Sequence, residues 1–379
     1  MVSRERERWV TALFFALSGL VSATWSSRIP DVQHRLGLPD GIWGIVLFSL
    51  PAGLVVGLSG ASWLVTRFGT TKTMISGSVL VSLFLCLAGA ANSVFLLVPA
   101  LFFIGFTRTI LNISINTRSI AVQTLYDRPI ITTFHGIWSV ACFGAAALGT
   151  ALIVWGIPPA YHFVMVAAVV VIIALLFVGK RNAAVGTTEK RPLFIKPDAY
   201  LLLLGSIAFC SMLSESTMFD WSVNYFEKIV GTDKGFITTG YTAFIIAMAS
   251  GRFGGDWLIH KYGVFVLIRA SGFLMAAGFM VAVLLPSLAP ATCGFFLIGL
   301  GTSVIIPIVY MLAARSTKMP PSYAIACVTM IGYGGFLLGP LVIGLLSEAY
   351  SMQWAFVLVS GVSLCIFFLS YFLKAKTAQ

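Results

Sequence analysis

The sequence predicts an all-α membrane protein with twelve transmembrane helices in two pseudo-symmetric six-helix halves. Of its 379 residues, 59% are hydrophobic and only 10% are charged, whereas a soluble globular protein carries about 25% charged residues. Twelve apolar stretches reach the length of about 20 residues that a helix needs to cross a bilayer. One basic linker divides them six and six, and a repeated segment relates the two groups.

The expected spans follow one another with short connections. In the first half they cover residues 9–29, 41–65, 71–91, 94–118, 131–156 and 158–179. In the second half they cover residues 199–223, 235–259, 264–286, 289–314, 322–347 and 351–373. We therefore expect an N-terminal six-helix bundle over 1–179, a cytoplasmic linker over 180–198 and a C-terminal six-helix bundle over 199–379.

The distribution of basic residues predicts the orientation in the membrane. The chain holds 24 Lys and Arg residues and has a formal net charge of +11. With a cytoplasmic N-terminus, the external loops hold only Arg28, Arg35, Lys228 and Lys234. Cytoplasmic loops carry the excess of Lys and Arg in membrane proteins, so we expect both termini in the cytoplasm. The basic N-terminus also resembles a signal peptide, but removing it would leave the halves unequal.

A repeated segment supports the division into halves. Residues 41–69 align without gaps on residues 235–263, an offset of 194 positions. Two glycines three positions apart would let neighbouring helices approach closely, and the basic-aromatic-glycine ending would make a tight turn. The matching positions are Gly57 and Gly251, Gly60 and Gly254, Trp63 and Trp257, Arg67 and Lys261, and Gly69 and Gly263.

A polar stripe interrupts the apolar span 94–118. Arg108, Asn112 and Asn116 are four positions apart, so a helix places them on one face. A charge at this depth costs about 2.5 kcal/mol or more and normally faces a bundle interior or a wet cavity. Arg108 could bind a carboxylate or phosphate of a substrate or pair with a protein acid, for which Glu215 in the other half is the candidate. The asparagines could bind a ligand or another helix. We assign Arg118, at the cytoplasmic end, to topology alone.

Acidic residues within the predicted spans are confined to the second half. Glu215 lies around the outer part of the midplane, and Asp220 lies nearer the external surface. Burial favours the protonated form of a carboxylate and a nearby arginine favours the charged form, so an acid that changes partners can load and release a proton. We predict Glu215 and Asp220 as proton-coupling residues. The alternatives are a permanent ion pair for Glu215 and an interfacial cap for Asp220.

Four aromatic residues are further candidates for substrate binding. Trp25 ends the first span and Trp138 begins the fifth, while Tyr241 and Tyr333 belong to the second half. Tryptophan at an interface is often an anchor and a tyrosine often only packs, so these alternatives stay open.

The turns that end the repeated segments are candidates for gating. We predict gating roles for Arg67 and Gly69 in the first half and for Asp256 and Lys261 in the second.

Together with the repeat, these features resemble the major facilitator superfamily. The loop signature of that family is G-x-x-x-D-R/K-x-G-R/K-R/K; Arg67-Phe68-Gly69 and Lys72 fit it, while Thr66 replaces the acid. Within the family the chain looks most like the fucose-permease-like branch and its bacterial inner-membrane members. The residues behind that likeness are Trp25-Ser-Ser-Arg28-Ile-Pro30, His135-Gly136, Glu215, Asp220-Trp221, Gly332-Tyr333 and Gly339-Pro340.

The resemblance implies a secondary transporter in the cell inner membrane, with a site near the midplane between the halves. Our first hypothesis is proton-coupled symport of a small polar solute, sugar-like or an organic anion. The alternatives are a proton-driven efflux pump for amphipathic compounds, favoured by the 13% aromatic content, and a receptor without transport. No Walker A sequence points to ATP, and no enzymatic motif, cofactor site or metal site is expected. The expected partners are a substrate, protons and the bilayer, not nucleic acid, and a monomer is expected.

Overall fold

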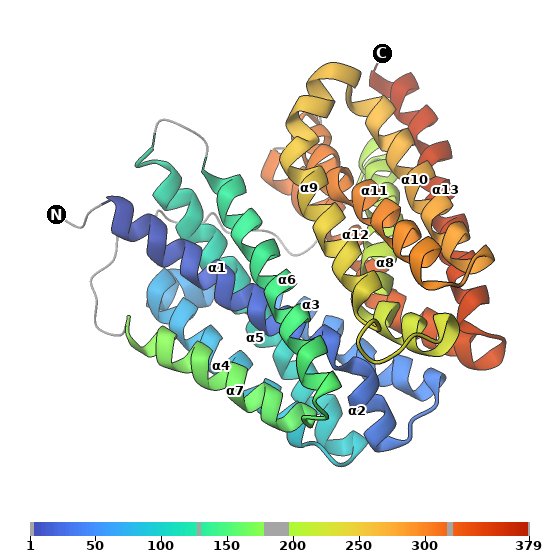
Figure 1. Cartoon of the computed structure of the whole chain (residues 1–379). Helices are drawn as coiled ribbons and strands as arrows, with labels where there is room; N and C mark the ends of the chain where they lie inside the picture. The colour runs from blue at the N-terminus through green and yellow to red at the C-terminus, as the bar shows by residue number, and fades with distance from the viewer. Residues whose placement is uncertain (1–3, 127–129, 178–196, 317–320, 378–379) are drawn as a thin grey trace. The chain divides into compact units, whose positions relative to one another are not determined.

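The computed structural model describes residues 4–126, 130–177, 197–316 and 321–377, and every regular element in them is helical (Figure 1). The predicted all-α membrane class is confirmed. Ten of the described helices are long and apolar enough to cross a membrane, and α7 is a shorter apolar helix. The linker predicted over 180–198 lies almost wholly outside the described residues.

Each predicted span has a helix at its position. Two short elements that the apolar pattern did not predict, α2 and η1, follow the first and seventh spans. The helices are α1 (Arg4–Ser27), α2 (Ile29–Leu36), α3 (Asp40–Phe68), α4 (Thr70–Ala90), α5 (Val94–Gln123), α6 (Ile131–Val154), α7 (Pro159–Leu175), α8 (Ala199–Tyr225), the π-helix η1 (Phe226–Val230), α9 (Thr239–Tyr262), α10 (Val264–Leu284), α11 (Leu288–Ala314), α12 (Pro321–Ala349) and α13 (Met352–Thr377).

The chain divides into two compact units. The first unit holds residues 1–38 and 49–190, and the second holds residues 39–48 and 191–379. The division therefore falls inside α3, whose first two turns pack with the second half of the sequence. The predicted N-terminal bundle over 1–179 contains the whole of α3. The observed division instead assigns the first turns of α3 to the second unit.

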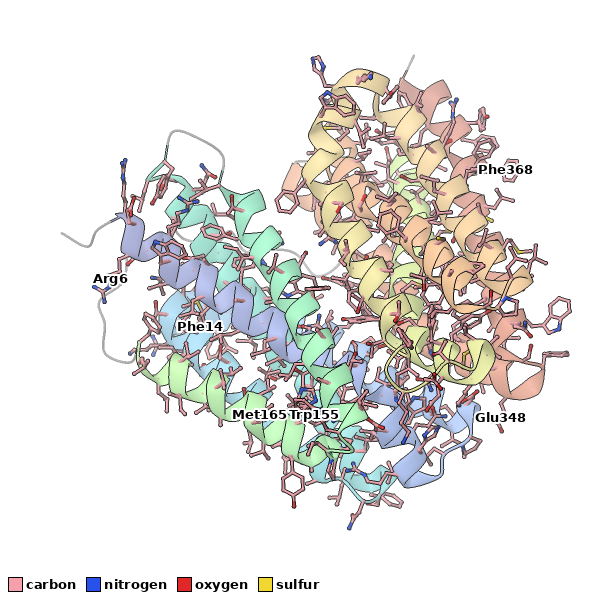
Figure 2. All side chains as sticks on the ribbon, viewed as in Figure 1. Arg6, Phe14, Trp155, Met165, Glu348 and Phe368 are labelled. Carbon is pink, nitrogen blue, oxygen red and sulfur yellow. The ribbon has the colours of Figure 1, made fainter. Side chains whose placement is uncertain are left out.

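Within each unit the helices pack in the same order. In the first unit α1 packs against α6 and α5, and α4 packs against α5 and α7. In the second unit α8 packs against α12 and α11, and α10 packs against α11 and α13. Phe14 on α1, labelled in Figure 2, is fully buried inside the first unit.

The repeat extends well beyond the segment in which the sequence shows it. Helices α4 and α10 keep the offset of 194 positions at both ends, from Thr70–Ala90 to Val264–Leu284. Four of the five glycines with positive φ in the described chain also form pairs at this offset. They are Gly37 (φ 61°) with Gly231 (φ 67°), and Gly69 (φ 84°) with Gly263 (φ 78°).

Glycine contacts between helices repeat as well. A Cβ on Gly105 of α5 would collide with the carbonyl oxygen of Leu50 on α3. At the equivalent place, a Cβ on Gly299 of α11 would collide with the carbonyl oxygen of Phe244 on α9. Only glycine permits this approach of two helix backbones. The two units thus share one backbone design down to individual helix crossings.

One expectation about these glycines is wrong in part. Gly57 and Gly251 do face close neighbours, Phe106 and Ser303 respectively. A Cβ at Gly60 or Gly254 would meet no atom within 4 Å in the described structure. The spacing of three positions places the second glycine of each pair on a different part of the helix surface, so only the first lies at the crossing.

Prolines do not divide the helices that contain them. Pro51, Pro307 and Pro340 lie inside α3, α11 and α12, and each helix continues through its proline. Transmembrane helices tolerate proline because neighbouring groups satisfy the backbone atoms that it frees.

Candidate functional site

The polar stripe predicted on α5 exists, and Arg108 is its most unusual member. Arg108 is half-buried, and its Nε atom is buried without a hydrogen-bond partner in the described structure. A guanidinium group has five N–H donors and no acceptor. An arginine in this setting is therefore prepared to bind an acceptor.

Helix α1 orients the next residue of the stripe. Ser18 Oγ donates to Oδ1 of Asn112 at 3.3 Å, which joins α1 to α5. Asn116 donates from Nδ2 to the backbone carbonyl of Asn112 at 2.8 Å, within α5. Both asparagines are half-buried. The predicted helix–helix bond is present at Asn112, whereas the bond of Asn116 stays within its own helix.

A buried ion pair at the predicted cytoplasmic end corrects the assignment of Arg118 to topology alone. Arg118 is 3% exposed and Glu7 is 5% exposed. Their side chains meet at 2.5 Å, and Arg118 also donates to Thr71 Oγ1 at 2.7 Å. The pair joins α1, α4 and α5. Helix α1 begins at Arg4, before the predicted start of the span, and so adds the acid Glu7 to a half whose predicted spans hold none.

A second buried cluster lies at the opposite end of α1. Arg28, which is 2% exposed, pairs with Asp31 at 2.6 Å and donates to the carbonyl oxygen of Ile157 at 2.7 Å. Its Nε donates to His162 Nδ1 at 3.2 Å. Trp25, predicted to bind substrate, is 3% exposed, and its ring centroid lies 6.2 Å from that of Phe163.

Helix α2 continues this cluster into the predicted external loop. Arg35 donates to the carbonyl oxygens of Gly89 at 2.5 Å and Ala88 at 3.3 Å, which caps the C-terminal end of α4. Burial lowers the pKa of the Arg35 guanidinium, and the nearby Asp31 carboxylate opposes that shift. Arginine remains protonated in proteins, so this cap keeps its charge.

In the second unit, Glu215 lies near an arginine that the sequence did not indicate as its partner. Glu215 Oε1 on α8 lies 3.9 Å from Arg252 on α9, and the two side chains are 15% and 35% exposed. That separation is longer than a hydrogen bond. Asp220 is half-buried on the same helix.

The predicted tyrosines of the second unit differ in burial. Tyr241 is fully buried, with its ring 6.1 Å from that of Phe219, and Tyr333 is half-buried. On α6 of the first unit Trp138 is half-buried too, and its carbonyl oxygen lies against Gly19.

The predicted gating turns have matching backbones. Gly69 begins α4 with φ 84° and ψ 153°, and Gly263 begins α10 with φ 78° and ψ 157°. Arg67 is exposed, and Lys261 lies over the rings of Trp257 at 4.8 Å and Tyr262 at 5.2 Å. The side chain of Asp256 lies outside the described structure.

A polar cluster in the second unit, at the predicted external end, was missed in the sequence. Asp40, in the first turn of α3, pairs with Lys228 of η1 at 2.6 Å and accepts from Ser347 of α12 at 2.7 Å. Glu348, labelled in Figure 2, accepts from the Gly41 amide at 2.6 Å. The contacts span more than 180 positions of sequence, which no local pattern reveals.

The family model described as Major Facilitator Superfamily matches residues 10–323. The chain belongs to the major facilitator superfamily. The earlier resemblance is therefore confirmed, and the protein is a secondary transporter of a small molecule, not an enzyme.

Two bacterial relatives extend over nearly the whole chain. An uncharacterized transporter of Sinorhizobium fredii is 31% identical over 349 residues, covering 91% of this chain and 92% of its own. An uncharacterized MFS-type transporter of Yersinia pestis is 29% identical over 358 residues, covering 94% of this chain and 93% of its own.

Solved structures share the fold at low identity. A bacterial homolog of the human lysosomal transporter Spinster has a TM-score of 0.79 at 15% identity, covering 99% of this chain and 97% of its own. The nucleoside transporter NupG has a TM-score of 0.75 at 14% identity, covering 96% and 99%. The E. coli fucose:proton symporter FucP has a TM-score of 0.61 at 16% identity, covering 97% and 98%.

Proposed function

We propose that this protein moves a small polar solute, sugar-like or an organic anion, across the bacterial inner membrane by alternating access. Protons drive the movement, the protein acts as a monomer, and both termini lie in the cytoplasm. The observation that carries the proposal is the half-buried Arg108 on α5, whose Nε has no partner in the described structure. A fully apolar cargo would give no reason to keep a charge at this depth.

The candidate for proton coupling is Glu215. Its carboxylate lies 3.9 Å from the Arg252 guanidinium. This distance allows electrostatic attraction between the two charges but is too long for a hydrogen bond. A carboxylate whose distance to an arginine changes during the cycle changes its affinity for a proton. Partial burial of Glu215, at 15% exposure, makes such a change effective because charges interact more strongly away from water.

The test uses vesicles that contain purified protein and a pH-sensitive dye. Addition of sugars, carboxylates and nucleosides one at a time should acidify the lumen for the true substrate. Glu215→Gln should abolish proton-driven accumulation while substrate exchange between the two sides continues. Glu5→Gln, at an exposed acid on α1, should behave like the unmodified protein. Proton uptake that persists in Glu215→Gln would exclude Glu215 as the coupling residue.

Vesicles prepared from the cell membrane, whose orientation is known, test the direction of transport. An importer accumulates substrate in right-side-out vesicles, whereas an efflux pump for amphipathic compounds accumulates it only in inverted ones. Accumulation of hydrophobic dyes in inverted vesicles alone would replace the proposal with the efflux function.

A further inference from the structure

The described acids of the first unit leave Arg108 without a countercharge. There are three of them, Glu5, Glu7 and Asp31. Glu7 pairs with Arg118, and Asp31 pairs with Arg28. Glu5 is exposed in the first turn of α1. The buried Glu7 and the partly exposed Asp31 are therefore each already matched to a buried arginine.

Distance along α5 separates Arg108 from the nearest of these acids. Arg118 is ten positions further along the helix, which is about 15 Å at 1.5 Å per residue. Glu7 bonds to the guanidinium of Arg118. It therefore balances the charge at the end of α5 and not the charge of Arg108 in the middle of the helix. Arg108 is half-buried and its Nε atom is buried without a partner in the described structure. A charge held partly away from water without a countercharge is destabilising, so we expect an anion beside Arg108.

The neighbouring asparagine faces the same space with a donor. The Oδ1 atom of Asn112 accepts from Ser18 Oγ at 3.3 Å, which leaves the Nδ2 amino group of Asn112 for a ligand. Arg108 offers only donors. A molecule bound at these two residues therefore meets N–H groups alone, and this arrangement suits an oxyanion better than a neutral sugar hydroxyl.

One helical turn further along α5, Asn116 offers a hydrogen-bond acceptor and not a donor. Asn116 uses its Nδ2 group to donate to the backbone carbonyl of Asn112, and its Oδ1 atom is left to accept. The stripe thus presents donors at Arg108 and Asn112 followed by an acceptor at Asn116. A ligand whose oxyanion binds Arg108 and Asn112 could donate a hydrogen bond to Asn116 from a separate hydroxyl group.

We propose that the substrate itself supplies the countercharge of Arg108, and that it is a small hydroxylated oxyanion, either a carboxylate or a phosphate. This inference rests on the proposed transport function, because it names the substrate class of that same site. It narrows the choice between a sugar-like molecule and an organic anion to the anion.

Chemical modification of arginine tests this inference without a known substrate. Phenylglyoxal, which reacts with free guanidinium groups, would be added to the purified protein, and modified residues would be located by mass spectrometry. Arg108 should react about tenfold or more faster than Arg28 and Arg118, because breaking a charge-assisted hydrogen bond costs about 1.5–3 kcal/mol. The exposed Arg4 monitors the activity of the reagent.

Matched pairs of ligands identify the class of the substrate. Galacturonate is compared with galactose, and glucose 6-phosphate with glucose. The charged member of one pair should slow the modification of Arg108, while its neutral partner should not; the pair that responds separates a carboxylate from a phosphate. Asn112→Leu should weaken this protection and leave the reaction of free Arg108 unchanged.

Several outcomes would overturn the inference. A slow reaction of Arg108 that becomes fast in Glu215→Gln or Asp220→Asn would show that a protein acid is its countercharge. Protection by neutral sugars only, or by no member of the panel, would contradict an anionic substrate. Continued transport of a neutral compound in the vesicle assay would then keep the proposed function while this inference fails.

Discussion

The two units share the positions of their helices and helix crossings but differ in the side chains that pack between the helices. At the predicted cytoplasmic end of the first unit, a buried ion pair between Glu7 and Arg118, with Thr71, joins three helices. The residues 194 positions later are apolar and belong to or pack against one hydrophobic cluster. They are Leu201, Leu312 and Phe265.

The opposite end shows the same substitution of charge by apolar contact. Arg28, Asp31 and His162 form the polar cluster of the first unit. The equivalent residues of the second unit are Ser222, Tyr225 and Phe356, in which the rings of Tyr225 and Phe356 stack at 4.2 Å. Even the cap at the end of α4 changes, since Tyr225 donates to the Ala282 carbonyl where Arg35 donates to that of Ala88.

The middle of the two units also differs in its polar residues. The counterparts of Arg108 and Asn112 are Thr302 and Ile306, and Thr302 only bonds to its own helix at the Ile298 carbonyl. Conversely, the counterpart of Glu215 in the first unit is the apolar Val21. The repeat therefore fixes where helices cross, while each unit has its own charged residues. Because apolar residues can replace a buried ion pair without loss of stability, the fold does not require the charges of the first unit.

The largest expected effect comes from removing one member of the inner ion pair. Glu7→Leu should lower the free energy of unfolding by about 3–5 kcal/mol, because it leaves Arg118 buried without its partner. Unfolding by a denaturing detergent measures the change. The control is Glu5→Gln, which alters an exposed acid on the same helix.

The triple variant Glu7→Leu, Thr71→Phe and Arg118→Leu copies the residues of the second unit. It should recover most of the stability lost by Glu7→Leu. A triple variant as unstable as the single one would mean that the two units are not interchangeable at this position, and the comparison would fail there.

A smaller and symmetric effect is expected at the helix crossings. Gly105→Ala and Gly299→Ala should each destabilise the protein by about 1–3 kcal/mol, because the added Cβ overpacks a backbone contact. Thermal unfolding in mild detergent measures both. Gly60→Ala and Gly254→Ala are matched controls, since their Cβ atoms would meet open space. Loss of stability in only one unit would limit the structural repeat to the other positions.

The smallest effect is expected at the left-handed glycines that end α2 and η1. Gly37→Ala and Gly231→Ala should each cost about 1 kcal/mol, because L-residues are strained at positive φ. Comparison of the melting temperatures would check that the two costs are similar. A much larger cost at Gly231 would indicate that η1, which carries Lys228, has a role that α2 lacks.

Much of the fold could be predicted from the sequence because apolar length is a local property. The span predicted over 264–286 coincides with α10, and the basic-aromatic-glycine endings correctly predicted the turns at Gly69 and Gly263. Helix α2 was missed because it is short and polar. The close approach predicted at Gly60 was wrong because sequence spacing does not show which face of a helix meets a neighbour.

The candidate site could be predicted only in its own helix. The spacing of Arg108, Asn112 and Asn116 on α5 was enough to place them on one face. The partners of the other charged residues could not be predicted, because Glu7 and Arg118 lie 111 positions apart in the sequence. In the sequence alone, nothing distinguishes Glu7 from the other charged residues of the basic N-terminus.

The central claim is that Arg108 selects an anion, and one exchange experiment tests it most directly. Vesicles that hold the purified protein and an unlabelled bacterial metabolite extract are placed in the same extract labelled with ¹³C, and mass spectrometry detects each compound that exchanges. We expect the unmodified protein to exchange hydroxylated anions and Arg108→Thr, which copies the second unit, to lose that exchange. Exchange of neutral compounds by the unmodified protein, or unchanged exchange by Arg108→Thr, would contradict the claim.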